Sequence, residues 1–178
     1  MSMKKMNLLK LGLVATIAGS FGTASAETIN GTATANVLTP LTLRETTALA
    51  YGDVYGGSTA GTVVVSSAGV ISATGGAGFK GGAHTAATFD ITGEVSTAIT
   101  VTLAPGSAAL DDGTAGGGGA PMALTAFTTT VLPTVTTAGG LATFGVGATL
   151  GVGINQTAGA YSTTTGDGVP YTVTVNYN

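Results

Sequence analysis

Polar and apolar residues alternate one by one along much of this chain, and this pattern limits its fold more than any other feature. Successive side chains of a β-strand point to opposite faces, so a period of two indicates strands with one buried and one solvated face. Turns that contain glycine separate the alternating runs, which is typical of β-sandwiches and barrels. We therefore predict an all-β, antiparallel sandwich with strands at residues 28–37, 62–66, 70–73, 88–92, 98–103, 142–152 and 171–177.

The first 26 residues have the organisation of a secretory signal peptide. Lysines precede a short apolar core at residues 11–18, and Ala24-Ser25-Ala26 supplies the small residues of a cleavage site. The core is shorter than the roughly 20 residues that cross a bilayer, and no later stretch is long and apolar enough. We predict cleavage before Glu27, export through the periplasm to the cell surface or medium, and one domain over residues 27–178 with no membrane span.

Charge and cysteine content exclude several partners and stabilising devices. After cleavage, Arg44 and Lys80 are the two fixed cations against eight acids, which leaves a net charge of −6. So acidic a chain has no electrostatic attraction to nucleic acid or to anionic lipid. With no cysteine, it has no disulfide to staple a small exported domain. Stability then has to come from the core, from strand pairing or from association.

A search for catalytic or metal-binding residues finds no convincing set. His84 is the single histidine, in a predicted loop, and no Ser and Asp pattern around it suggests a catalytic triad. One histidine without cysteine is too little for zinc. Asp111 and Asp112 are too few oxygen ligands for a recognisable calcium loop, and a solvated turn explains them better. We expect no enzymatic activity, no catalytic residue, no metal and no cofactor.

Six motifs occur in order along the predicted domain, at residues 32–43, 49–52, 88–94, 147–156, 159–162 and 171–177. Together they resemble the bacterial domain of unknown function 4402 family. More distantly, the chain is similar to spore-coat-U-like and chaperone–usher pilin subunits, and this likeness implies an Ig-like sandwich of the pilin/adhesin kind. One departure is an insertion at residues 163–170, between the Tyr161-Ser162 pair and the last strand.

The resemblance implies a structural cell-surface protein, pilin-like or coat-like, that forms a homo-oligomer or filament by exchanging a β-strand. A periplasmic chaperone and an outer-membrane usher are the partners it implies. In such an exchange, residues 28–37 would lie in a groove of a neighbouring copy, and the last strand would line that groove. If residues 28–37 instead belong to their own domain, the alternative is a monomeric, secreted or surface-attached adhesive module. The candidate assembly residues are Ile29, Gly31, Ala33, Ala35, Val37, Tyr171, Val173, Val175 and Tyr177.

Overall fold

A computed structural model describes residues 25–104, 106–114, 119–130 and 140–178. The predicted signal peptide core and Ala24, the first residue of its cleavage site, lie outside these residues. The described residues contain no helix, and every strand pairing is antiparallel, which confirms the all-β prediction. The strands are β1 (Thr42–Thr47), β2 (Ala50–Val65), β3 (Ile71–Thr85), β4 (Ala87–Thr92), β5 (Ile99–Ala104), β6 (Ala109–Leu110), β7 (Met122–Thr129), β8 (Leu141–Val152) and β9 (Thr172–Tyr177).

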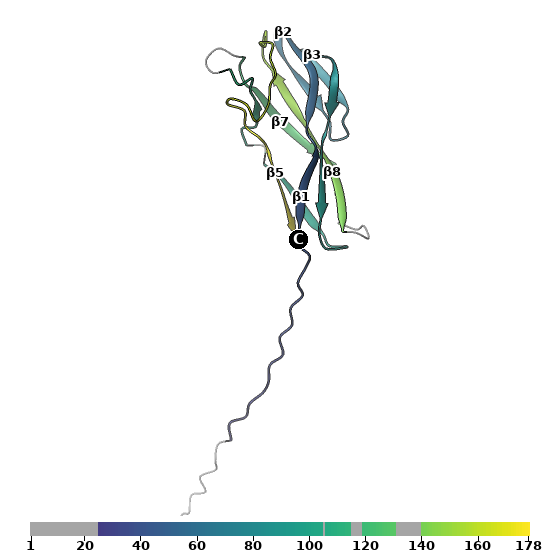
Figure 1. Ribbon diagram of the computed structural model, residues 1–178, viewed down its shortest axis with the longest axis vertical. Coiled ribbons are helices and arrows are strands. Elements are labelled where there is room, and N and C mark those ends of the chain that lie inside the picture. Colours follow the sequence, from purple (N-terminus) through teal and green to yellow (C-terminus); the bar gives the residue numbers. More distant parts are fainter. Residues whose placement is uncertain (1–24, 105, 115–118, 131–139) are drawn as a thin grey trace, which may run out of the picture. The chain divides into compact units, whose positions relative to one another are not determined.

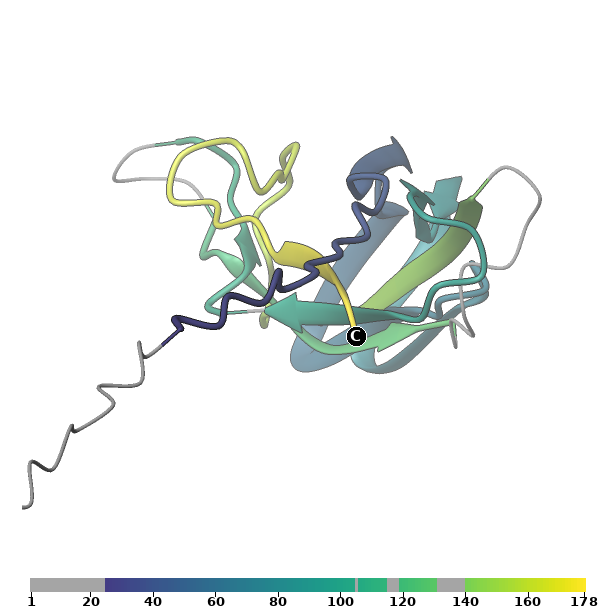
Figure 2. The same cartoon turned by 90° about the horizontal axis from the view of Figure 1, so that it is seen from below.

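Two sheets form the sandwich (Figures 1 and 2). The larger sheet has the order β1-β4-β8-β2-β3, with β7 also paired to β8 and β6 paired to β7. The smaller sheet consists of β5 and β9, paired from Ile99 opposite Tyr177 to Ala104 opposite Thr172. Strand β8 is central because its first half pairs with β4 and its second half with β2. Strand β1 is at an edge of the larger sheet.

The core follows the period-two pattern of the sequence. In β8, Phe144, Val146, Ala148, Leu150 and Val152 are all buried. The ring of Phe144 stacks on that of Phe89 of β4, with centroids 5.3 Å apart. In β9 the odd-numbered residues are half-buried and the even-numbered ones exposed, as predicted. Burial of one face of strands such as β4 and β8 is what holds this cysteine-free domain together.

Strands β2 and β3 correct two predictions. Residues 62–66 and 70–73, predicted as short strands, are the tips of a much longer hairpin that turns through Gly69. His84, predicted to be in a loop, lies in β3 opposite Tyr51. The rings of His84 and Phe79 form a T-shaped pair with their centroids 5.0 Å apart. The glycines before His84 shift the register of the strand without ending it. A bulge of this kind accommodates an extra residue while pairing continues on both sides.

The prediction of a strand at residues 28–37 is wrong for the single chain. Residues 25–41 form no strand, and Ile29 and Val37 are 93% and 91% exposed. The compact unit that holds all nine strands comprises residues 37–178. An extended segment becomes a strand only when another strand satisfies its backbone groups. We call residues 27–37 the N-terminal segment; within the described chain its residues take no part in either sheet.

Candidate functional site

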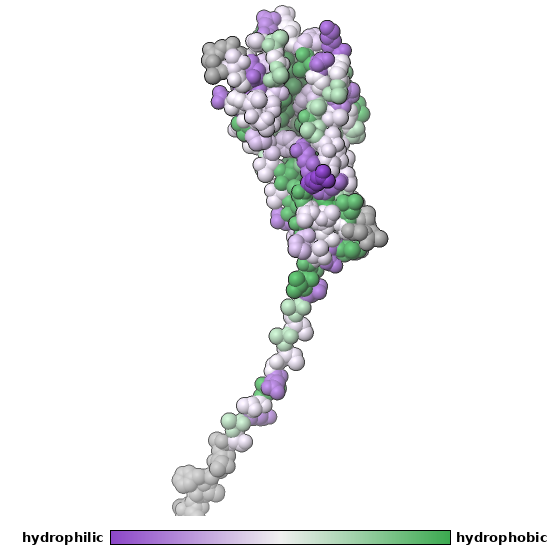
Figure 3. Space-filling view, viewed as in Figure 1, coloured by the Kyte–Doolittle hydropathy of each residue, from purple (hydrophilic) through white to green (hydrophobic). Residues whose placement is uncertain are grey.

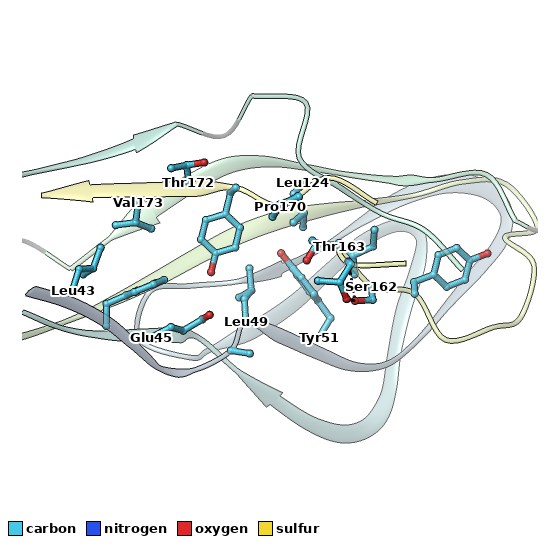
Figure 4. Close-up of a pocket in the computed structure, with 16 residues that line it drawn as sticks. Leu43, Glu45, Leu49, Tyr51, Leu124, Ser162, Thr163, Pro170, Thr172 and Val173 are labelled. Atoms are coloured by element: carbon cyan, nitrogen blue, oxygen red, sulfur yellow. Dashed lines mark hydrogen bonds between the residues drawn. The ribbon is translucent and has the colours of Figure 1, made fainter. Parts of the chain in front are cut away.

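A groove opens between β1 and β9, which we call the β1–β9 groove. Among the described residues, β1 pairs with β4 alone and β9 with β5 alone, so each strand keeps one unpaired edge. The groove has a volume of about 620 Å³. Leu43 and Glu45 of β1 line one side and Val173 of β9 the other, and Leu49 and Tyr51 lie farther along the groove (Figure 4). Apolar residues line a furrow on this face of the domain (Figure 3).

A second hollow continues the β1–β9 groove toward the other end of the sandwich. It has a volume of about 790 Å³ and shares Leu49, Tyr51, Leu110 and Tyr161 with the groove. One of its polar side chains, Gln156, is bonded within the domain: its amide nitrogen donates to the Tyr161 hydroxyl and the Ala120 carbonyl, at 2.9 and 2.6 Å. These polar groups are therefore committed to the protein. The cleft as a whole is lined by both apolar and polar residues.

Two tyrosine hydroxyls behave differently in this groove. The Tyr51 hydroxyl donates to the Ala148 carbonyl at 3.0 Å, and burial raises the Tyr51 pKa. The Tyr171 hydroxyl is buried and makes no hydrogen bond with the described residues. Burial, with a smaller contribution from the negative charge of Glu45, raises the Tyr171 pKa to about 12. A buried hydroxyl without a partner is unfavourable for the folded domain.

This difference predicts opposite effects of removing each hydroxyl. Tyr51→Phe should lower the free energy of unfolding by about 1–3 kcal/mol, because it leaves the buried Ala148 carbonyl without this donor. Tyr171→Phe should leave that free energy unchanged or raise it by about 1 kcal/mol, because it removes an unsatisfied buried group. Urea unfolding of the unassembled protein measures both. Equal losses would show that the Tyr171 hydroxyl already has a partner.

The insertion at residues 163–170 forms one end of the groove. Thr163, Thr164 and Pro170 line it. The loop is fixed by Asp111, which is 7% exposed and whose carboxylate accepts the amides of Gly113 and Asp167, both at 3.0 Å. Asp111 also exchanges two backbone hydrogen bonds of 2.9 Å with Ser162. The insertion therefore shapes the groove next to the start of β9.

Hydrogen bonds to backbone amides also account for Asp112, the neighbour of Asp111. Asp112 accepts the amides of Thr114 and Gly119 at 2.9 and 2.8 Å, and the Gly119 bond first, then the Thr114 bond, lowers the Asp112 pKa. Both carboxylates thus bind backbone amides: those of Asp112 lie in its own loop, whereas Asp111 binds one in its own loop and one in the insertion. No group of three or more His, Asp or Glu side chains in the described part of the chain could hold a metal ion. Residues 115–118 of this loop lie outside the described residues.

The structure brings together part of the predicted assembly set. Tyr171 and Val173 line the β1–β9 groove. Val175 and Tyr177 pack against the cluster of buried core residues that includes Phe144. The residues predicted to enter a neighbouring groove lie in the exposed N-terminal segment. They are Ile29, Gly31, Ala33, Ala35 and Val37.

The groove residues on the side of β1 were not predicted from the sequence. Leu43, Glu45, Leu49 and Tyr51 had no assigned role, although the alternation of Leu41 and Leu43 is a short signal for an edge strand.

The fold and the groove define an antiparallel β-sandwich in which β1 and β9 each keep an unpaired edge beside a partly apolar cleft. A model of the domain of unknown function (DUF4402) family matches residues 41–177, and the chain belongs to this family. The match begins just before β1 and leaves out the N-terminal segment. No match was found among curated proteins or solved structures. Within the described ranges, no helix has the length and hydropathy to cross a membrane.

Proposed function

We propose that this protein is an exported structural subunit that joins to copies of itself by strand exchange. In this proposal, the N-terminal segment of one copy lies in the β1–β9 groove of the next. The observation that carries it is that both sheets form without the N-terminal segment while β1 and β9 keep unpaired edges along a partly apolar groove. An extended peptide that adds to exposed strand edges gains backbone hydrogen bonds, and its alternate side chains enter the groove.

The N-terminal segment has the length and pattern that this role needs. Its 11 residues, from Glu27 to Val37, reach about 35 Å when extended, which exceeds the roughly 20 Å of a six-residue strand such as β1 or β9. Ile29, Ala33 and Val37 share one face with Gly31 and Ala35, and Thr and Asn occupy the other. Small residues in the middle of the segment suit a groove that is lined by the bulky side chains of Tyr51 and Tyr171.

Export is part of the proposal. An unassembled subunit with two open strand edges and an exposed, partly apolar groove is a template for aggregation. We propose a periplasmic chaperone and an outer-membrane usher as the partners that protect and deliver it, and the cell surface as its location.

The export step predicts a defined N-terminus. Because Ala24-Ser25-Ala26 follows a short apolar core, the exported protein should begin at Glu27. Intact-mass spectrometry of material sheared from the cell surface measures this directly. Recovery of a species that retains the signal lysines would contradict it.

A peptide with the sequence of residues 27–37 tests the proposal itself. Fluorescently labelled peptide should bind the unassembled protein saturably and compete with its assembly, measured by anisotropy, size-exclusion chromatography and negative-stain microscopy. A peptide with Ala33→Asp is the matched control and should not bind, because its charge would be buried without a partner. Absence of binding, together with a monomer under all conditions, would favour the adhesive module instead.

A further inference from the structure

We infer that hydrogen bonds around Thr39 keep the N-terminal segment out of the groove of its own domain, so that a second copy fills it. This inference rests on the proposed function. It concerns which copy supplies the strand, since a segment that can enter a neighbour's groove could also fold back into its own and stop assembly.

Thr39 is held by residues from two distant parts of the chain, and we call this set of contacts the Thr39 clamp. The Thr39 amide and hydroxyl donate to one carboxylate oxygen of Glu94, at 2.9 and 2.8 Å. The Tyr177 hydroxyl donates to the Thr39 carbonyl at 2.5 Å and accepts the Glu94 amide at 2.6 Å. Every polar group of Thr39 is thereby engaged. Hydrogen bonds to a carboxylate are among the stronger ones, and the Thr39 bonds lower the Glu94 pKa.

Close packing reinforces the clamp. A Cβ atom placed on Gly93 would lie 2.6 Å from the Tyr177 hydroxyl and 2.7 Å from a methyl group of Leu41. Real Cβ atoms do not approach other atoms so closely, so glycine at this position lets the end of β9 reach the residues that precede β1. The chain before β1 is thus tied to the last strand of the domain.

The clamp opposes the turn that self-insertion would require. To lie beside β1, the N-terminal segment would have to form a hairpin with it, and residues 38–41 would be the loop. A four-residue loop is long enough for a hairpin. Thr39 would be a central residue of that turn, where helical or left-handed backbone angles are needed. Pro40 instead favours an extended Thr39, and the clamp fixes the three groups that the turn would have to release.

Loss of the clamp should convert the protein into a self-complemented monomer. The test variant combines Glu94→Ala with Tyr177→Phe. It should bind the labelled peptide of residues 27–37 about tenfold more weakly or worse, because its own segment occupies the groove most of the time. Adding Ala33→Asp to this variant should restore peptide binding to the level of the parent protein, since a charged segment cannot stay in the groove. Asp90→Ala, which removes another carboxylate–threonine contact, to Thr143, is the matched control and should leave binding unchanged.

Each result has a defined meaning. Unchanged peptide binding by the folded double variant would overturn the clamp inference and leave the proposed function standing. Weak binding that Ala33→Asp does not restore would also overturn it, because the groove itself would then be damaged. Failure of the parent protein to bind the peptide would overturn both. Should the double substitution disturb folding, insertion of Asn-Gly-Gly after Val37 supplies a new turn outside the clamp and should produce the same restorable loss of binding.

Discussion

Ala33→Asp is expected to abolish assembly while the melting temperature of the unassembled protein stays unchanged. Ala33 is exposed in the single chain, so a charge there costs the domain nothing. In the β1–β9 groove of a neighbouring copy, the same carboxylate would lose its water without gaining a partner. That desolvation costs several kcal/mol, and about 4 kcal/mol already weakens association about a thousandfold.

Thr34→Asp provides the control, because Thr34 lies on the opposite face of the alternating segment. It should assemble nearly as the parent protein does. Filament counts by negative-stain microscopy, with thermal melting of the unassembled fraction, give both readouts. If Ala33→Asp instead lowers the melting temperature in step with assembly, the N-terminal segment is an integral strand, and the monomeric adhesive module becomes the better description.

Phe144→Ala should unfold the protein or bring it close to unfolding. Phe144 is 1% exposed at the centre of β8 and stacks on Phe89. Truncating a buried phenylalanine to alanine typically costs about 3–5 kcal/mol, whereas a small domain has a total stability of about 5–15 kcal/mol. With no cysteine in the chain, no disulfide can offset the loss.

The neighbouring Thr143→Ala is the matched control, since Thr143 is exposed and bonds the Asp90 carboxylate at 2.7 Å. It should change the free energy of unfolding by less than about 1 kcal/mol. Urea titrations followed by circular dichroism compare the two variants. A loss below about 1 kcal/mol for Phe144→Ala would mean that the stacked pair does not anchor the core.

The sequence predicted well wherever the two faces of a strand differ in burial. Strands β4, β5, β8 and β9 follow this rule, and their alternation was sufficient to place them within about one residue. The hairpin of β2 and β3 was underestimated because glycines interrupt its alternation. A Cβ atom on Gly76 would clash with the Thr59 carbonyl oxygen. These glycines allow the two strands to approach closely, whereas the sequence pattern was interpreted as turns.

The parts of the site that were not predicted depend on contacts between distant residues. Asp111 was interpreted as part of a solvated turn, yet it is buried because it binds the amide of Asp167, 56 residues later. Thr39 and Glu94, 55 residues apart, gave no local signal at all. Only tertiary structure brings such pairs together. The N-terminal segment shows the opposite case, because its alternation is typical of a strand, but its own chain provides no pairing partner.

The separation of groove and N-terminal segment into different parts of the chain determines the kind of assembly that strand exchange would build. Each copy would use one surface to receive and another to donate, so the contact is head-to-tail and does not complete itself in a dimer. Such contacts continue into rings or open fibres. A fibre of this protein would be polar, with an empty groove at one end and an unpaired segment at the other. Growth at the two ends would then require different chemistry, and a copy lacking only the segment would cap one end while leaving the other able to grow.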